Sequence, residues 1–241
     1  MKILRGIGVS EGVVLAPIYY FKPQKPEIIL KREENFEKEQ KRFELAQEQA
    51  AAQLKDLQKK LQGYLGEKEM QMFEVYEMML RDEDFNDAVK EELRCNRVNA
   101  EYAVDKVKES FVQIFLQMDD SYMKSRAADI EDVSDRLIQN LKGEAEQEVN
   151  LEVASVILAE DLTPSEMMRV HPQKIAALVI SKGSNNSHVS ILAKAMKIPM
   201  VIGIQQPIYQ EWNGKLALTD GKQGVFIIEP DDNVRRELLK G

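Results

Sequence analysis

This sequence of 241 residues contains little that could cross-link it, hold zinc or cross a membrane. Its single cysteine, Cys95, excludes an internal disulfide and a cysteine-rich metal site, which predicts a reducing, cytoplasmic location. It has no apolar run of roughly 18 residues and no secretory signal at its start, so we expect no membrane association. Its two histidines, His171 and His188, show no zinc-binding spacing.

Positive charge is also in short supply. The formal net charge of -8 argues against a nucleic-acid partner. The imbalance lies in the middle of the chain, where residues 31–147 hold 19 lysines and arginines against 28 aspartates and glutamates. We expect this part either to attract a partner with a basic face or to form an ordinary solvated surface.

Proline and glycine are scarce in the same part of the chain. All eight prolines lie outside residues 27–163, and that interval contains three glycines. Because proline breaks helices and glycine weakens them, the interval predicts long helices that fold as hairpins or a bundle. We expect a helix of about 30 residues ending at Gly63 and Gly66, helices at 67–80 and 83–95, one from a cap at Asn99 to about 119, and one from a cap at Ser121 to Gly143.

The composition of the flanking segments is typical of a β-sheet. Apolar runs at 153–158, 175–180, 200–202, 216–218 and 225–228 predict strands buried on both faces, with helices at 164–170 and 188–197 between them. The glycine-punctuated segment 3–20 predicts further strands that join the same sheet. The sequence therefore predicts an α/β domain from residues 1–21 and 149–230, an all-α domain inserted at 22–148, and the start of a linker helix at 231–241.

His188 is the clearest indication of function. It follows the polar run Gly-Ser-Asn-Asn-Ser at 183–187 and opens an apolar stretch typical of an amphipathic helix. Free backbone N–H groups and the positive end of the helix dipole would stabilise an anion on the ring without a metal. The same field disfavours the imidazolium and keeps a ring nitrogen nucleophilic. We interpret His188 as a candidate phosphate carrier, against the alternative of a capping or surface histidine.

Two neighbouring residues have simpler interpretations. Ser187 could bond to the histidine ring or serve only as the helix N-cap. His171 precedes Pro172, so we expect it to be an exposed cap at the C-terminus of the preceding helix. The sequence contains neither a nucleotide P-loop nor the nucleophile elbow of a serine hydrolase.

Four segments, taken in order, carry a family resemblance. Residues 187–193 (Ser-His-Val-Ser-Ile-Leu-Ala) followed by 198–203 (Ile-Pro-Met-Val-Ile-Gly) resemble the phosphohistidine signature of the phosphoenolpyruvate-utilising enzymes. Residues 6–12, 125–133 and 159–166 narrow the resemblance to the N-terminal half of enzyme I of the phosphoenolpyruvate:sugar phosphotransferase system. It runs from residue 1 to about 230, and implies an α/β swivelling phosphohistidine domain with an inserted all-α domain.

The resemblance implies a phosphoryl relay in sugar transport. His188 would accept the phosphoryl group of phosphoenolpyruvate and pass it to a histidine of the small carrier protein HPr. In the family, phosphoenolpyruvate and Mg²⁺ bind a C-terminal barrel domain that also dimerises. Because the sequence ends at Gly241 without that barrel, we expect no cofactor in this chain and no reaction with phosphoenolpyruvate alone.

The resemblance also implies two groups of site residues. Gly183, Asn186, Ser187 and Thr163 would surround the phosphoryl group. The partner-binding residues would be Glu67, Glu74, Met78, Met79, Glu83, Asp84 and Arg126, although an ion pair between Arg126 and Asp129 is the structural alternative.

The match departs from the family at the phosphohistidine loop. Ser184 and Asn186 stand where the family usually has glycine and threonine, which should alter loop flexibility, phosphohistidine stability and transfer rate. Two other functions stay open. The chain could be the swivelling domain of another enzyme, such as pyruvate phosphate dikinase or the dihydroxyacetone kinase phosphocarrier, or a regulatory adaptor that binds HPr without forming phosphohistidine.

Overall fold

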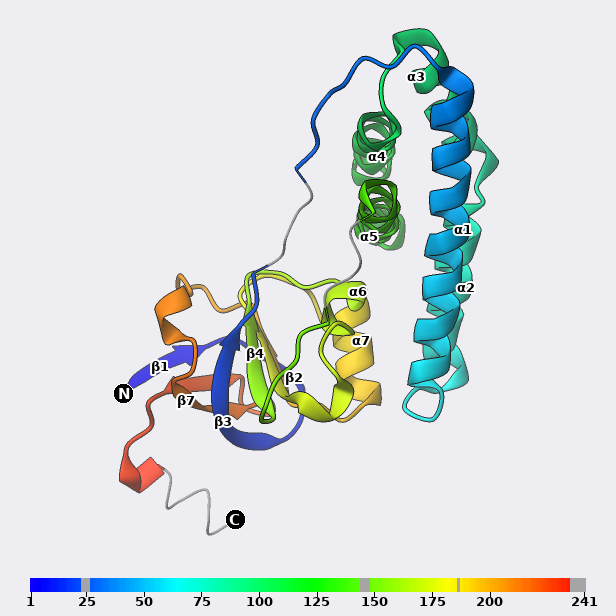
Figure 1. Cartoon of the computed structure of the whole chain (residues 1–241). Coiled ribbons are helices and arrows are strands. Elements are labelled where there is room, and N and C mark those ends of the chain that lie inside the picture. The colour runs from blue at the N-terminus through cyan, green and yellow to red at the C-terminus, as the bar shows by residue number, and fades with distance from the viewer. Residues whose placement is uncertain (23–26, 144–147, 186, 235–241) are drawn as a thin grey trace. The chain divides into compact units, whose positions relative to one another are not determined.

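The computed structural model describes residues 1–22, 27–143, 148–185 and 187–234. It divides into two compact units (Figure 1). One consists of Met1–Gln24 and Gln147–Gly241, and the other of Lys25–Glu146. None of the helices in the described ranges combines the length and apolar character needed to cross a membrane.

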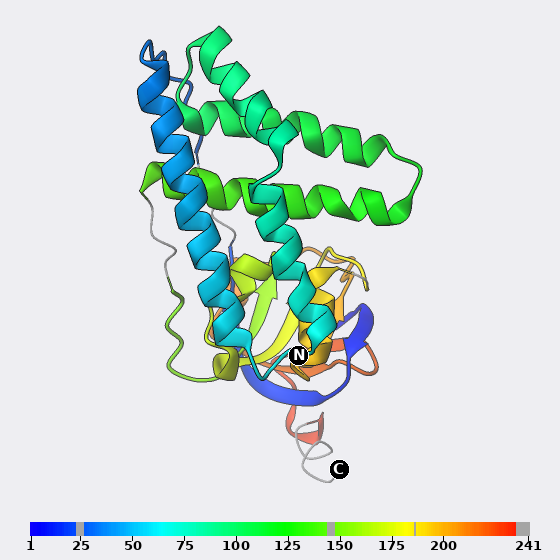
Figure 2. The ribbon, with the colours of Figure 1, turned by 90° about the vertical axis from the view of Figure 1, so that its right-hand side faces the viewer.

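The described part of the second unit is helical. It comprises α1 (Phe36–Leu61), α2 (Glu67–Leu80), α3 (Glu83–Asn96), α4 (Ala100–Gln117) and α5 (Ser121–Lys142). Figure 2 shows α4 and α5 side by side, with α1 running across both of them. Phe43, Val89, Val104 and Leu137 are fully buried between these helices. The predicted helices are confirmed to within a few residues, because the apolar spacing that defines each one also forms its buried face.

The helix ends show which capping predictions fail. The cap of α5 is Asp120, whose Oδ1 accepts N–H bonds from Tyr122 and Met123, so the predicted cap Ser121 is wrong. Asn99 is the N-cap residue of α4, as predicted, but its side chain makes no capping bond to the helix: its Oδ1 accepts from the backbone N–H of Lys31 at 2.8 Å. The carboxylate of Asp120 is a stronger hydrogen-bond acceptor for the free N–H groups of the first turn than a serine hydroxyl is. Asp120 is therefore favoured over Ser121 as the N-cap.

The first unit contains a mixed sheet. Its strands are β1 (Lys2–Arg5), β2 (Ile7–Ser10), β3 (Val13–Tyr20), β4 (Ser155–Ala159), β5 (Ile175–Ile180), β6 (Met200–Ile202), β7 (Leu216–Asp220) and β8 (Val225–Ile228). Within the described residues these eight strands form one sheet, in the order β1-β8-β7-β3-β4-β5-β6-β2. The run from β3 to β6 is parallel, and the other pairs are antiparallel. The prediction that the N-terminal strands join this sheet is confirmed.

Short helices connect the strands. These are α6 (Pro164–Met167), the 3-10 turn η1 (Pro172–Lys174), α7 (His188–Ala195) and the 3-10 turn η2 (Gln210–Trp212). The predicted helix at 164–170 is therefore too long by three residues. At the C-terminus, Asp231 Oδ1 accepts from the backbone N–H groups of Asn233 and Val234 at the start of a helical turn. Residues 235–241 of the predicted linker helix lie outside the described residues.

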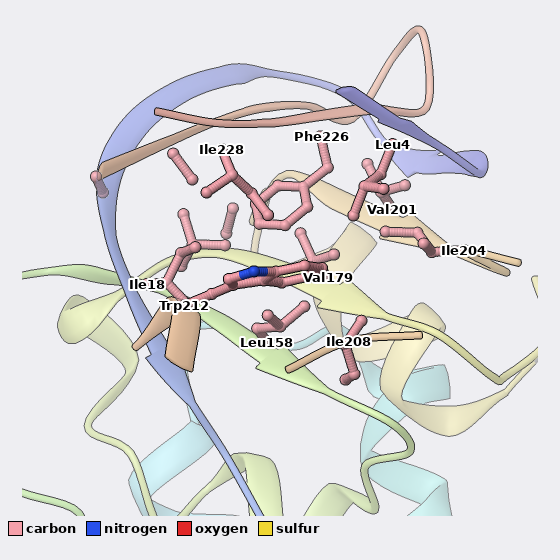
Figure 3. Close-up of a cluster of buried hydrophobic side chains, with 14 residues drawn as sticks. Leu4, Ile18, Leu158, Val179, Val201, Ile204, Ile208, Trp212, Phe226 and Ile228 are labelled. Atoms are coloured by element: carbon pink, nitrogen blue, oxygen red, sulfur yellow. The ribbon is translucent and has the colours of Figure 1, made fainter. Parts of the chain in front are cut away.

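The sheet curls around its own core. Strands β1 and β2 stand at opposite ends of the strand order, yet only Gly6 separates them in the chain. Figure 3 shows the enclosed side chains, among them Leu4, Val179, Trp212 and Phe226, all buried. Burial of this apolar cluster is the main source of stability in the unit.

Closure of the sheet depends on glycines at backbone crossings. A Cβ added to Gly221 would lie 1.9 Å from the carbonyl oxygen of Ser10, and one added to Gly6 would lie 2.3 Å from that of Ile202. Both obstacles are main-chain atoms, which cannot move aside as a side chain can. The backbone segments therefore meet at distances that only glycine permits.

We predict that Gly221→Ala destabilises the α/β unit by about 2 to 3 kcal/mol or more, because the added methyl must push strand backbones apart. Urea unfolding followed by the fluorescence of Trp212, the single tryptophan, measures this unit. Gly203→Ala is the matched control: its φ is +68°, and its Cβ would meet only the end of Ile7 at 3.9 Å. Its cost should be about 1 kcal/mol. Equal losses in the two variants would contradict the role assigned to close backbone contact.

Candidate phosphohistidine site and partner surface

His188 is the first residue of α7, and it is half-buried. Ser187 is the N-cap of this helix, with its Oγ accepting the backbone N–H of Ser190 at 3.3 Å. The predicted helix start is thus confirmed, and the open question about Ser187 is resolved toward an N-cap. His188 thus belongs to the first turn of α7, where backbone N–H groups converge, an arrangement suited to holding an anion.

The loop before His188 follows strand β5, which ends at Ile180. In sheets with parallel strands, ligand sites form beyond the carboxyl ends of the strands, and this loop occupies such a position. Gly183 has φ +98°, and a Cβ there would make only an ordinary contact with the Ile180 side chain at 3.9 Å, so glycine is required for the backbone angle and not for close packing. Asn186 lies outside the described residues.

Helix α7 holds this loop through its own side chains. Ser190 Oγ donates to the carbonyl oxygen of Ser184 at 2.7 Å, and Ser187 Oγ donates to Ser190 Oγ at 3.0 Å. Lys194 Nζ donates to Asn185 Oδ1 at 2.8 Å. Ser190 and Lys194 were not predicted as site residues from the sequence. Their spacing of three and seven residues from the N-cap places them on the helix face above the loop, which is the signal that could have found them.

Thr163 lies at another helix start, the N-cap of α6. Its Oγ1 accepts the backbone N–H of Glu166 at 3.2 Å, while Glu166 Oε2 accepts the backbone N–H of Thr163 at 2.9 Å. This capping box gives Thr163 a structural role. Helix α6 packs against α7 (Figure 1). Contact between Thr163 and a phosphoryl group stays a prediction.

His171 is exposed, but the predicted C-terminal cap is wrong. Its Nδ1 accepts the backbone N–H of Gln173 at 3.4 Å, so it precedes η1 instead of ending α6. The reason is that α6 stops at Met167, four residues earlier. Across the described ranges, no group of three or more histidines, cysteines or acidic residues could hold a metal ion.

The residues assigned to partner binding lie on α2, α3 and α5. Glu67 and Glu74 on α2 are exposed, as are Glu83 and Asp84 in the first turn of α3. Met78 is 70% exposed, an unusual state for a methionine, whereas Met79 is half-buried. Exposed acidic side chains and the exposed Met78 thus lie on the same two neighbouring helices of this unit.

An apolar groove lies beside these residues. Its lining comes from α2, α4, α5 and the start of α3: Met79, Asp82, Phe85, Phe111, Phe115, Ile130, Val133 and Ser134. The rings of Phe85 and Phe111 meet edge to face with centroids 5.3 Å apart. These aromatic residues were not predicted as site residues from the sequence. Phe111 and Phe115, one helical turn apart and flanked by the exposed Ile114 and Leu116, were the available signal.

Arg126 belongs to a network near this groove. Its Nη1 donates to Asp129 Oδ2 at 2.9 Å, its Nη2 donates to Tyr122 Oη, and its guanidinium lies over the Tyr122 ring. Tyr76 Oη donates to the other oxygen of Asp129 at 3.3 Å. The ion pair considered from the sequence is therefore present. It fixes the guanidinium in place, which is compatible with a contact to a partner.

Tyr76 is the buried end of this network, being 2% exposed. Burial raises the pKa of its phenol well above the usual value, and the negative charges of Asp132 and Asp129 raise it further. The phenol therefore stays protonated as a donor to Asp129.

Comparison with known proteins agrees with this geometry. A family model described as PEP-utilising enzyme, N-terminal, matches residues 5–126, and one described as PEP-utilising enzyme, mobile domain, matches residues 151–224. The phosphoenolpyruvate-protein phosphotransferase of Priestia megaterium is 32% identical over 239 residues, covering 96% of this chain and 40% of that protein. That of Bacillus subtilis is 31% identical over 238 residues, covering 98% of this chain and 42% of that protein.

Solved structures give the same result. A solution structure titled as enzyme I (nEIt) has a TM-score of 0.77 and 27% identity, covering 98% of this chain and 97% of that one. The N-terminal domain of Enzyme 1 - Nitrogen shares the fold, with a TM-score of 0.64 at 22% identity and 98% coverage of each chain.

The chain belongs to the phosphoenolpyruvate-utilising enzymes, having both their N-terminal and their mobile domain. Within that family it corresponds to the N-terminal part of enzyme I, the phosphoenolpyruvate-protein phosphotransferase. It spans about 40% of the length of the curated relatives it matches.

We predict that Tyr76→Phe reduces the loss of stability at high pH. Since the folded-state pKa of Tyr76 is raised, its neutral form stabilises the fold below the unfolded-state pKa of about 10, and this contribution is lost as the pH rises further. Between pH 8 and pH 11 the parent should lose about 1 kcal/mol more than Tyr76→Phe in urea unfolding followed by far-UV circular dichroism. Tyr64→Phe, at an exposed phenol, is the control and should follow the parent. Parallel losses in the parent and Tyr76→Phe would refute this role.

Proposed function

We propose that this chain is the phosphoryl relay of enzyme I in a sugar phosphotransferase system, with His188 as the residue that carries the phosphate. The observation that supports this most directly is the position of His188 at the first turn of α7, capped by Ser187. Backbone N–H groups there can bind phosphoryl oxygens, while the ring supplies the nucleophile. Cys95, exposed and free, fits a reducing cytoplasm.

The transfer requires no metal in this unit and no net proton. A neutral ring nitrogen of His188 attacks the phosphorus of the donor in line, so one N–P bond forms as the bond to the donor breaks. With HPr, the donor and the acceptor are both imidazoles, and the reaction runs in either direction. Phosphoenolpyruvate is the original donor and would bind the part of enzyme I that follows this chain.

The helical unit is the docking site for HPr in this proposal. The groove lined by Met79, Phe85, Phe111 and Phe115 would receive an apolar side chain of the partner. The exposed acids Glu67, Glu74, Glu83 and Asp84 would steer a basic face toward it. Arg126, held by Asp129, would add a positively charged contact beside the groove.

We predict that His188→Ala abolishes phosphoryl exchange with ³²P-labelled phospho-HPr, because no other residue of the loop offers an imidazole. The measurement is acid-labile label on the protein after mixing. His171→Ala, which removes the exposed histidine that precedes η1, should take up phosphate like the parent. Undiminished labelling of His188→Ala would exclude the proposal.

Labelling of the parent chain, combined with a titration of HPr binding, separates the alternatives. A regulatory adaptor binds HPr but forms no phosphohistidine in the parent chain. The swivelling domain of another phosphoenolpyruvate-utilising enzyme shows no HPr binding at all. Incubation with phosphoenolpyruvate and Mg²⁺ in place of phospho-HPr should leave the 241-residue chain unlabelled.

We predict that Glu74→Lys weakens HPr binding about three- to tenfold at low salt, because the substitution reverses one of the negative charges assigned to the partner surface. The loss should shrink as salt screens the surface charges. Titration calorimetry at two ionic strengths tests both effects. The control is Glu48→Lys, the same charge reversal at an exposed position of α1. If both variants bind equally well, the partner surface has been assigned to the wrong helices.

A further inference from the structure

We propose that Ser190 is a positioning residue for His188: its buried hydroxyl ties the preceding loop to α7 and thereby holds the imidazole in line for phosphoryl transfer. This inference rests on the proposed function. Ser190 is fully buried, two residues after His188 and within the same helical turn. It does not touch the transferred group, and acts through the loop and the N-cap.

The direction of its hydrogen bonds follows from their acceptors. Ser190 Oγ lies 2.7 Å from the carbonyl oxygen of Ser184, which can only accept, so the single hydroxyl proton of Ser190 is committed to that bond. At the 3.0 Å contact between the two hydroxyls, Ser187 must then be the donor. Ser187 Oγ also accepts the backbone N–H of Ser190. The bond from Ser190 to Ser184 thus determines the direction in which the Ser187 hydroxyl donates.

This orientation has a consequence for the phosphoryl group. The hydroxyl proton of Ser187 points to Ser190, so in this arrangement Ser187 offers only lone pairs toward an incoming anion. Stabilisation of the phosphoryl oxygens then depends on the backbone N–H groups of the first turn of α7. By holding the loop against α7, Ser190 keeps these N–H groups and the His188 ring aligned with the loop.

The hydrogen bond from Ser190 to Ser184 also restrains a loop that has little rigidity of its own. Gly183 has a left-handed backbone angle, and Ser184 and Asn185 are exposed. The bond from buried Ser190 to Ser184 therefore restrains an otherwise solvent-facing segment four residues before His188. Small displacements of a reacting group lower transfer rates strongly, because in-line attack tolerates little misalignment.

Ser190→Ala tests this inference through the kinetics of phosphate transfer from phospho-HPr. We expect kcat to fall about tenfold with KM unchanged, because docking is assigned to the helical unit. Ser190→Cys keeps the size of the side chain with a weaker donor, and its kcat should lie between those of the parent and Ser190→Ala. A rate within twofold of the parent, or a loss confined to KM, would overturn the proposal.

Ser10→Ala is the matched control. Ser10 is also buried, and its Oγ donates to the carbonyl oxygen of Ala193 at the far end of α7, at 3.4 Å. Its removal costs a buried hydrogen bond to the same helix without touching the loop, so kcat should stay at the parent value. Equal losses of rate in Ser10→Ala and Ser190→Ala would reduce the role of Ser190 to general stability.

Hydrogen exchange provides a readout without a partner. The backbone amides of Ser187 and Ser190, which donate to the Ser184 carbonyl at 3.2 Å and to Ser187 Oγ at 3.3 Å, should exchange about tenfold faster in Ser190→Ala and unchanged in Ser10→Ala. Unchanged exchange in Ser190→Ala would overturn the proposal that the Ser190 hydroxyl restrains the loop. If the parent chain itself takes up no phosphate, the proposed function fails. If the parent is active and Ser190→Ala matches it, only this inference fails.

Discussion

The α/β unit depends on close contact between backbone segments where its sheet curls on itself. Gly6 joins the two ends of the strand order, and Gly221 meets the carbonyl of Ser10 where any side chain would collide. This closure encloses the core around Trp212 and Phe226, and it places β2 against α7. The helix that carries His188 is therefore supported by strands from the opposite end of the chain.

In the proposed relay, the two units would divide the tasks between two different kinds of surface. In the α/β unit, polar side chains of α7 hold a short loop, and the helix start offers N–H groups to an anion. The helical unit presents an apolar groove among acidic side chains, with Arg126 fixed by Asp129. Carrying a phosphoryl group requires a small, preorganised polar site, whereas recognising a protein requires area and charge.

Local patterns predicted the elements well and their details less well. The helix at 67–80 was predicted at its observed bounds, because apolar spacing and flanking glycines are properties of neighbouring residues. The cap of α5 was misassigned, since Asp120 and Ser121 are both good caps and only the backbone geometry selects one. Asn99 bonds instead to Lys31, a residue 68 positions away, which no local rule could reveal.

The sequence by itself determined the succession of helices and strands and the placement of His188 at a helix start, because both follow from short-range periodicity and capping. Only the tertiary structure decided the strand order, the groove formed by Phe85, Phe111 and Phe115, and the attachment of Tyr76 to Asp129. It also decided that the proton of Ser190 is committed to the loop. Most of these contacts join residues that are far apart in the chain, so no local sequence pattern predicts them. Only the packing of the folded chain brings these residues together.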